Sequence, residues 1–176
     1  MKQKLGLVFL HYIRLLSKLQ LFKLNILRRI LGKKKIKNVG ITGSAGKTST
    51  MYAVVAALQD EFRVKFSRKA NSESGIPLNI LGLQMHDFSL QDWFRVAGLA
   101  VVKLFTNWEN YDVYVVEMGI DEPTPPKNMA YLLKIIRPDI GVFVSVTSVH
   151  GMQFQSMCTY EVQVEEVIAD EKAKMI

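Results

Sequence analysis

The sequence predicts an α/β protein, in which a mostly parallel β-sheet carries helices on both faces. The first observation is a short apolar run at residues 39–42, which enters a glycine-rich turn and then a helix-forming stretch at 51–58. The second is a pair of continuously hydrophobic runs, 112–118 and 140–146, typical of strands buried on both faces of a parallel sheet. Helical patterns separate these runs, as they do in a doubly wound sheet.

The turn after the first predicted strand has the composition of a phosphate-binding loop, Gly-Ser-Ala-Gly-Lys-Thr-Ser at residues 43–49. Glycines let several backbone N–H groups approach a polyphosphate, and the N-terminus of the next helix adds N–H groups and a favourable dipole. Lys47 would place a positive charge at the β- and γ-phosphates, and the Thr48 hydroxyl could hold Mg²⁺. The alternative is an ordinary glycine-rich turn before a helix. We expect ATP and Mg²⁺ as cofactors, with the nucleotide bound by Gly43, Ser44, Ala45, Gly46, Lys47, Thr48 and Ser49.

The charges divide the chain into two parts, 1–37 and 38–176. The whole chain of 176 residues has a net charge of +7, and residues 1–37 hold 11 Lys/Arg with no Asp/Glu. Residues 38–176 hold 12 Lys/Arg and all 16 Asp/Glu, so their net charge is −4 and nucleic acid is not an expected partner. The single cysteine, Cys158, excludes an internal disulfide framework and fits a reducing cytoplasm.

Residues 5–30 form a basic amphipathic pattern, expected as one helix or as two pieces. Its apolar positions recur at three- and four-residue spacing: Leu5, Val8, Tyr12, Leu15, Leu19, Phe22, Ile26 and Ile30. Charges interrupt every apolar run before the roughly 18 residues that a membrane span needs, so we expect neither a span nor a cleaved signal. Two interpretations stay open. The helix lies on the anionic inner surface of a membrane, aided by the lysines at 33–35, or it packs on its own domain or a partner.

The other elements follow in order along the chain. We expect a short strand at 63–66, a polar loop at 67–75, and helices at 78–83, 92–105, 128–136 and 160–176. In the helix at 92–105 the apolar residues Phe94, Leu99, Val102 and Phe105 are interpreted as packing residues.

Two candidate metal ligands follow the predicted buried strands. Glu117 lies at the carboxyl end of the strand at 112–118, the edge where doubly wound sheets bind their ligands. A carboxylate beside a bound triphosphate suits Mg²⁺, whereas the alternative is a strand-end Glu paired with a Lys or Arg. His150 comes four residues after the strand at 140–146, at the same edge, and is either a second ligand or a surface residue.

Four sequence blocks together resemble the Mur ligase family, most closely its UDP-N-acetylmuramoyl-tripeptide:D-alanyl-D-alanine ligase branch. The blocks are Gly-Ile-Thr-Gly-Ser-Ala-Gly-Lys-Thr-Ser-Thr at 40–50, Asn-Ser-Glu-Ser-Gly-Ile-Pro at 71–77, Val-Glu-Met-Gly at 116–119, and Arg-Pro-Asp-Ile at 137–140 followed by His150. The resemblance covers residues 38–176. Within it, Ser145 stands where the branch usually has Asn.

The resemblance implies an ATP-dependent amide ligase, in which a substrate carboxylate is phosphorylated and the acyl phosphate is attacked by an amine. It implies that Lys47 steadies the phosphates, that Thr48 and Glu117 hold Mg²⁺, and that His150 holds a second Mg²⁺. Lys172 matches a family lysine that becomes a carbamate and then ligates metal; a solvated helix lysine is the alternative. Asn71 and Glu73 match a loop that faces the substrate.

The function expected from the resemblance is ligation of an amino acid or D-alanyl-D-alanine to a nucleotide-linked muropeptide in the cytoplasm. Residues 38–176 would be its ATP-binding domain without the C-terminal domain that brings the amine, so the isolated chain is expected to be inactive in ligation. Two alternatives remain: a related ligase acting on folate or poly-amino-acid substrates, and a non-catalytic, membrane-associated nucleotide-binding module.

Overall fold

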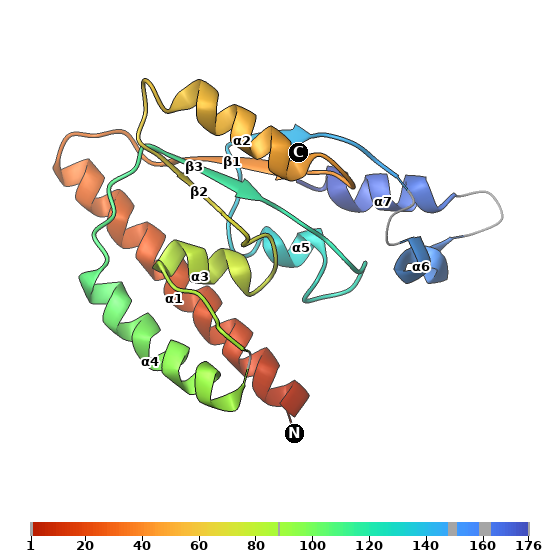
Figure 1. The fold of residues 1–176 in the computed structure, drawn as a ribbon, viewed down its shortest axis with the longest axis horizontal. Coiled ribbons are helices and arrows are strands. Elements are labelled where there is room, and N and C mark those ends of the chain that lie inside the picture. The colour runs from red at the N-terminus through yellow and green to blue at the C-terminus, as the bar shows by residue number, and fades with distance from the viewer. Residues whose placement is uncertain (1, 88, 148–150, 159–162, 176) are drawn as a thin grey trace.

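The computed structural model describes residues 2–87, 89–147, 151–158 and 163–175 (Figure 1). Its strands are β1 (Lys37–Thr42), β2 (Val64–Phe66), β3 (Val113–Glu117) and β4 (Ile140–Phe143). Its helices are α1 (Lys2–Ile30), α2 (Lys47–Leu58), α3 (Gly75–Leu81), α4 (Leu90–Thr106), α5 (Met129–Leu132), α6 (Gly151–Phe154) and α7 (Val164–Ala173), with a 3₁₀ turn at Gln155–Met157. The predicted strand–turn–helix order is therefore present at β1 and α2, with residues 43–46 between them.

The sheet is parallel, as predicted, in the order β2-β3-β1-β4. All five residues of β3 are buried because helices cover both faces of this strand. Val113 and Val115 pack with α2 on one face, whereas Tyr114 and Val116 pack with α3, α5 and α7 on the other. Figure 1 shows α2 on one side of the sheet and α1, α3, α4 and α5 on the opposite side.

Two predicted elements differ from the structure. The strand at 140–146 was expected to be buried, but β4 is an edge strand of four residues, and Ile140 is 56% exposed. It pairs only with β1 among the described strands, which leaves one side of its ladder unpaired. The helix at 128–136 shortens to α5 followed by turns, with the Asn128 side chain accepting a bond from the N–H of Tyr131 as N-cap.

The N-terminal helix α1 is one continuous element that packs on its own domain. Its buried side carries Ile13, Leu16 and Leu24, which contact α3, α4 and the core beneath the sheet. The polar residue Gln20 is also buried there and donates to the carbonyl of Asn107 at 2.9 Å. Most of the predicted apolar positions face the other way: Val8, Phe22 and Ile30 are 64%, 64% and 75% exposed, whereas Tyr12 is half-buried.

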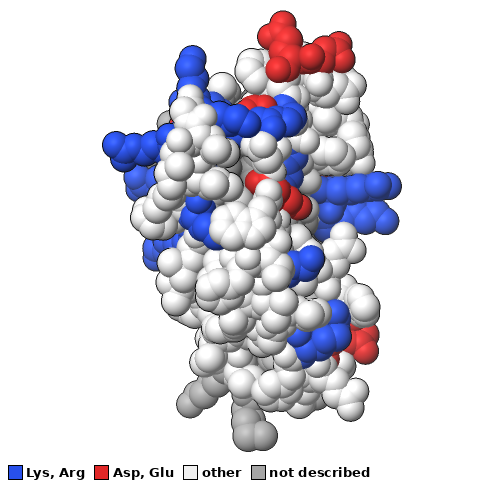
Figure 2. All heavy atoms as spheres, turned by 90° about the vertical axis from the view of Figure 1, so that its left-hand side faces the viewer, with Lys and Arg blue, Asp and Glu red and all other residues white. Residues whose placement is uncertain are grey.

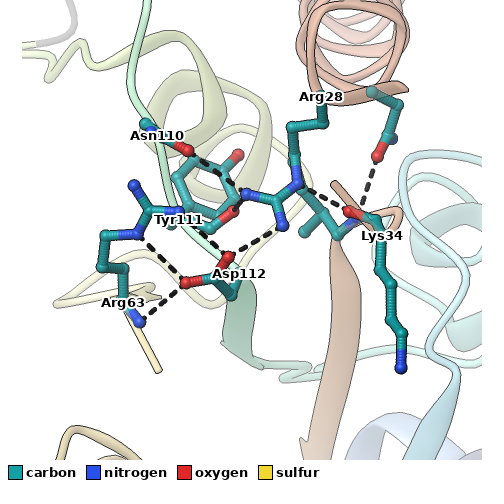
Figure 3. Close-up of polar contacts among 8 residues, drawn as sticks. Arg28, Lys34, Arg63, Asn110, Tyr111 and Asp112 are labelled. Atoms are coloured by element: carbon teal, nitrogen blue, oxygen red, sulfur yellow. Dashed lines mark hydrogen bonds and ion pairs between the residues drawn. The ribbon is translucent and has the colours of Figure 1, made fainter. Parts of the chain in front are cut away.

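The C-terminal end of α1 is fixed to the sheet by a buried arginine (Figure 3). Arg28 donates to the carbonyls of Lys34 and Tyr111 at 2.8 and 2.9 Å and to Asp112 Oδ1 at 2.8 Å. Arg63, which precedes β2, donates to the same carboxylate through its backbone N–H and its guanidinium. The two arginines hold the pKa of Asp112 well below its usual range, mainly through the hydrogen bonds from Arg63.

This arrangement predicts an acid-sensitive contribution to stability. Because the pKa of Asp112 is lower in the folded state, its ionised carboxylate stabilises the fold fully at pH values above the ordinary aspartate pKa of about 3.9. This stabilisation is lost as the pH falls from that value toward the lower pKa of the folded state. Asp112→Asn should cost about 1–3 kcal/mol at pH 7, because it removes the charged partner of buried Arg28. Urea unfolding of both proteins at pH 7 and at pH 3 measures this. The difference between them should shrink at pH 3; a difference independent of pH would contradict the assignment.

Two observations bear on the sequence-based interpretation of the apolar helices. By length and composition Leu5–Ile30 is long and apolar enough to cross a membrane, but buried helices and signal sequences pass the same test, so the expectation of no span stays a prediction. In α4, the residues expected to pack are exposed, Phe94 at 70% and Phe105 at 69%, with Leu99 and Val102 also outside. Val96 and Ala100 are the fully buried apolar residues of α4 in the cluster with α1 and α3, and Leu104 packs against that cluster.

Candidate functional site

The candidate site lies at the carboxyl edge of the sheet, where β1 turns into α2. Gly43 and Gly46 both have positive φ, 154° and 81°, in a region that side chains rarely adopt. A Cβ at Gly43 would lie 3.0 Å from the N of Ser145, so the close approach of the loop to the segment after β4 requires glycine. Gly46 is the N-cap of α2, whose first N–H groups have no partners within the helix and point out of its N-terminus.

Two lysine side chains converge on the carbonyl of Gly43. Lys47 Nζ donates to it at 2.7 Å and to the carbonyl of Ser44 at 3.1 Å. Lys172 Nζ, from the buried side of α7, donates to the Gly43 carbonyl at 3.2 Å. The sequence places these residues 125 positions apart, and the fold brings both cations to one loop carbonyl. Such a pair is a favourable environment for an anion.

The buried position of Lys172 changes its protonation. Desolvation, together with the positive charge of Lys47, lowers the pKa of Lys172 to about 8, although the charge of Asp121 acts in the opposite direction. Lys172 is still mostly a cation at pH 7, but the lowered pKa makes its neutral, nucleophilic amine far more populated than in an ordinary lysine. The sequence alone left a solvated helix lysine as the alternative, and the burial of Lys172 excludes that alternative.

The loop is held from outside by residues after β4. Ser145 accepts the N–H of Ser44 on its carbonyl at 2.8 Å and the N–H of Ala45 on its hydroxyl at 3.0 Å, and that hydroxyl donates to the carbonyl of Ala45 at 2.9 Å. Thr147 N–H donates to the Ser44 hydroxyl at 3.0 Å. Sequence reasoning noted Ser145 only as a departure from the family pattern. Its role as a loop support depends on the β1–β4 pairing, which a local pattern does not show.

Glu117 lies beside the loop, at the end of β3 and in register with Ile41 of β1. Its side chain is buried, and the described residues contain no Lys or Arg ion pair to it, so the paired-carboxylate alternative receives no support there. The backbone N–H of Glu117 donates to the Ser67 hydroxyl at 2.8 Å, and this bond fixes the end of β3. His150 lies outside the described residues.

The oxygen donors at this edge fit Mg²⁺. A carboxylate from Glu117 and a hydroxyl from exposed Thr48 are the donor types that Mg²⁺ takes, and the ion usually needs only one or two protein ligands beside phosphate oxygens and waters. Within residues 2–87, 89–147, 151–158 and 163–175, no group of three His, Cys, Asp or Glu side chains forms a complete metal cage. The donors therefore suit an ion that is bridged to a nucleotide.

The loop at 71–75 reaches the same edge of the sheet, just beyond β3. The carbonyl of Asn71 accepts the N–H of Gly119 at 2.9 Å, just beyond β3. Glu73 instead lines a cavity of about 180 Å³ with residues of α1 and α4, including Phe9 and Trp93. Burial is the main cause that raises the pKa of Glu73 above its usual value. Asp121 and Glu122, which follow β3, also raise this pKa, whereas Lys127 lowers it, so Glu73 lies between the helical layer and the segment after β3.

Comparison with known proteins gives consistent matches. The model of the family described as Mur ligase middle domain matches residues 41–174. A UDP-N-acetylmuramoyl-tripeptide:D-alanyl-D-alanine ligase of Borreliella burgdorferi is 28% identical over 175 residues, which is 97% of this chain and 29% of that protein.

A solved structure gives the same result. The MurF ligase of Thermotoga maritima in complex with ADP superposes with a TM-score of 0.57 at 27% identity, over 93% of this chain and 29% of that one. The chain thus spans less than a third of the length of both relatives. Since the middle-domain match extends over most of the sheet and includes both the loop after β1 and Lys172, the chain belongs to the Mur ligase family.

Proposed function

We propose that this chain is the ATP-binding part of an ATP-dependent amide ligase of cell-wall precursor synthesis. The substrates we infer are a UDP-N-acetylmuramoyl peptide and an amino acid or D-alanyl-D-alanine, and the compartment is the cytoplasm. The observation that carries the proposal is the convergence of Lys47 and Lys172 on the Gly43 carbonyl, at the start of α2 and beside Glu117. The ADP complex of the Thermotoga maritima relative supports nucleotide binding.

Each side chain has a distinct role in this proposal. Lys47 exchanges its bonds to the Gly43 and Ser44 carbonyls for bonds to the β- and γ-phosphates, while the first N–H groups of α2 hold the same phosphates. Glu117 and Thr48 would supply ligands for one Mg²⁺ and His150 for a second, and these ions would neutralise phosphate charge during transfer. Asn71 and Glu73 come from the loop that faces the substrate, with Asn71 beside the strand end.

Lys172 contributes in a modified form. Its neutral amine attacks CO₂, a nitrogen–carbon bond forms, and one proton leaves, which produces a carbamate anion with two oxygen donors. The lowered pKa of Lys172 supports this reaction because it supplies the neutral amine near neutral pH. The carbamate would be an acceptor for metal, which an ammonium is not.

A magnesium titration tests the proposal at Glu117. Mg²⁺ should tighten ATP binding by the wild-type chain about tenfold or more, and Glu117→Gln should lose most of this gain because it removes the anionic ligand. Isothermal calorimetry with ATP, in Mg²⁺ and in EDTA, measures both affinities. Glu166→Gln, an exposed change on α7, is the control and should keep the gain. A folded Glu117→Gln protein with the full magnesium gain would overturn the assignment.

A further inference from the structure

The helices α1 and α4 form one layer on the side of α3 that faces away from the sheet (Figure 1). Phe9 and Trp93 stack with their ring centroids 5.6 Å apart, and the Tyr12 hydroxyl donates to the carbonyl of Ala97 at 2.9 Å. Lys23 joins the other ends by donating to the carbonyls of Leu104 and Asn107. The two helices therefore present their outward sides together.

The outward side of this layer is apolar to an unusual degree. The most exposed large residues are Val8, Phe22 and Ile30 on α1 and Phe94 and Phe105 on α4, each at least 64% exposed. We call it the α1–α4 face, and it consists of Leu5, Val8, Leu15, Leu19, Phe22, Ile26, Ile30, Leu90, Phe94, Val101, Phe105 and Trp108. Contiguous exposed apolar surface of this kind marks an interaction site.

The two helices contribute to one continuous surface. A groove of about 210 Å³ lies between them and is lined almost entirely by apolar atoms of Leu5, Val8, Phe9, Tyr12, Trp93, Phe94 and Ala97. Figure 2 views the molecule from the side where α4 lies and shows a broad area without charged side chains, with Lys and Arg and fewer Asp or Glu side chains at its margins.

Cations border the α1–α4 face along α1. A second groove has a volume of about 340 Å³. Phe22 and Ile26 of the α1–α4 face line it together with the cationic side chains of Arg29, Lys33 and Lys35. Lys18 is exposed on the same helix, and residues 1–37 contain no Asp or Glu. On α4 the one acidic residue, Asp92, is buried and bonded to Arg95.

We propose that the α1–α4 face docks on an anionic lipid bilayer, with both helices lying in the plane of its surface. Exposed aromatic and aliphatic side chains would enter the boundary between headgroups and acyl chains, and the bordering cations would meet anionic headgroups. A second copy of the chain fits poorly, since it would bring the same positive α1 against itself. A transmembrane α1 would break the buried bonds of Gln20 and Arg28 to the loop before β3.

Vesicle binding by the 176-residue chain tests this proposal. The wild-type chain should sediment with vesicles of 70% phosphatidylcholine and 30% phosphatidylglycerol, less with pure phosphatidylcholine, and less at high salt. The double variant Phe94→Ser/Phe105→Ser should lower the partition coefficient about tenfold or more, because two exposed aromatic anchors are lost. Met152→Ser/Ile140→Ser removes two similarly exposed apolar side chains elsewhere and should bind like wild type.

Three kinds of result would overturn the proposal. The first is a vesicle result: no binding of the wild-type chain to anionic vesicles, or equal binding by a Phe94→Ser/Phe105→Ser variant whose circular dichroism is native. The second is a wild-type dimer in sedimentation velocity that this variant abolishes without any vesicle binding, which would make the face a protein interface. The third is binding by the 176-residue chain but not by a longer protein that includes it, which would mean that further protein covers the face.

Discussion

Replacing Lys47 with alanine should weaken ATP binding roughly 10- to 150-fold. The estimate follows from the loss of charge-assisted hydrogen bonds to phosphate, worth on the order of 1.5–3 kcal/mol. Lys47 is suited to this role because its amine already lies against the loop carbonyls of Gly43 and Ser44, at the N-terminus of α2. Calorimetric titration with Mg·ATP measures the effect.

The control for this experiment is Lys134→Ala, which removes an exposed lysine near α5 and should leave the affinity unchanged. Far-ultraviolet circular dichroism of both variants checks that the fold is intact. Equal affinity of the wild type and a folded Lys47→Ala protein would refute the assignment of the loop to phosphate binding.

Amine-dependent phosphate release should rise at least about 100-fold when a C-terminal ligase region that holds the amine is supplied in trans. Holding the acyl phosphate and the amine at near-attack distance contributes several kcal/mol of barrier reduction. We expect that residues 1–176, which span 29% of the length of both relatives, lack the groups that position the amine. The chain alone should show only slow hydrolysis that the amine does not accelerate.

A phosphate-release assay that contains the UDP-N-acetylmuramoyl peptide, with and without D-alanyl-D-alanine, measures this rise, and the Lys47→Ala chain mixed with the same region is the matched control. This mixture should show no stimulation by the amine, because the Lys47→Ala chain binds ATP too weakly to form the acyl phosphate even when the added region is present. Robust ligation by residues 1–176 without an added partner would show that an amine site is built from this chain, for example around Asn71 and Asp121.

The sequence was informative where local chemistry determines the structure. The apolar run before Gly43 and the run at 112–118 became β1 and β3 because both strands are central in the sheet, and central parallel strands must be hydrophobic throughout. The same reasoning failed for 140–146, since an edge strand can also be apolar and its position in the sheet is a matter of tertiary pairing.

The helical layer was harder to predict for a related reason. In α1, apolar residues occupy two sides of the helix, and periodicity selected the side with Val8 and Phe22 although Ile13 and Leu24 are the buried ones. Buried polar groups determine which side of α1 faces the core. Gln20 and Arg28 donate to carbonyls in the loop before β3, and hydrophobic periodicity does not take such bonds into account. Lys47 and Lys172 were predicted from motifs and resemblance, and the fold brings both to the Gly43 carbonyl, whereas Ser145 required knowledge of the β1–β4 contact.

The anchoring of α1 has a practical consequence for anyone who expresses this domain. The family match begins at residue 41, yet Leu24, Ile36 and Arg28 all lie before it and are buried against the sheet and its helices. A protein that begins at residue 41 would lack Leu24 and Ile36, which belong to the same core cluster as Ile80 and Tyr114. It would also lack Arg28, one of the two arginines bonded to Asp112, and the first four residues of β1. We expect such a fragment to be insoluble, and a nucleotide assay on it would then report misfolding and not the chemistry of the phosphate loop.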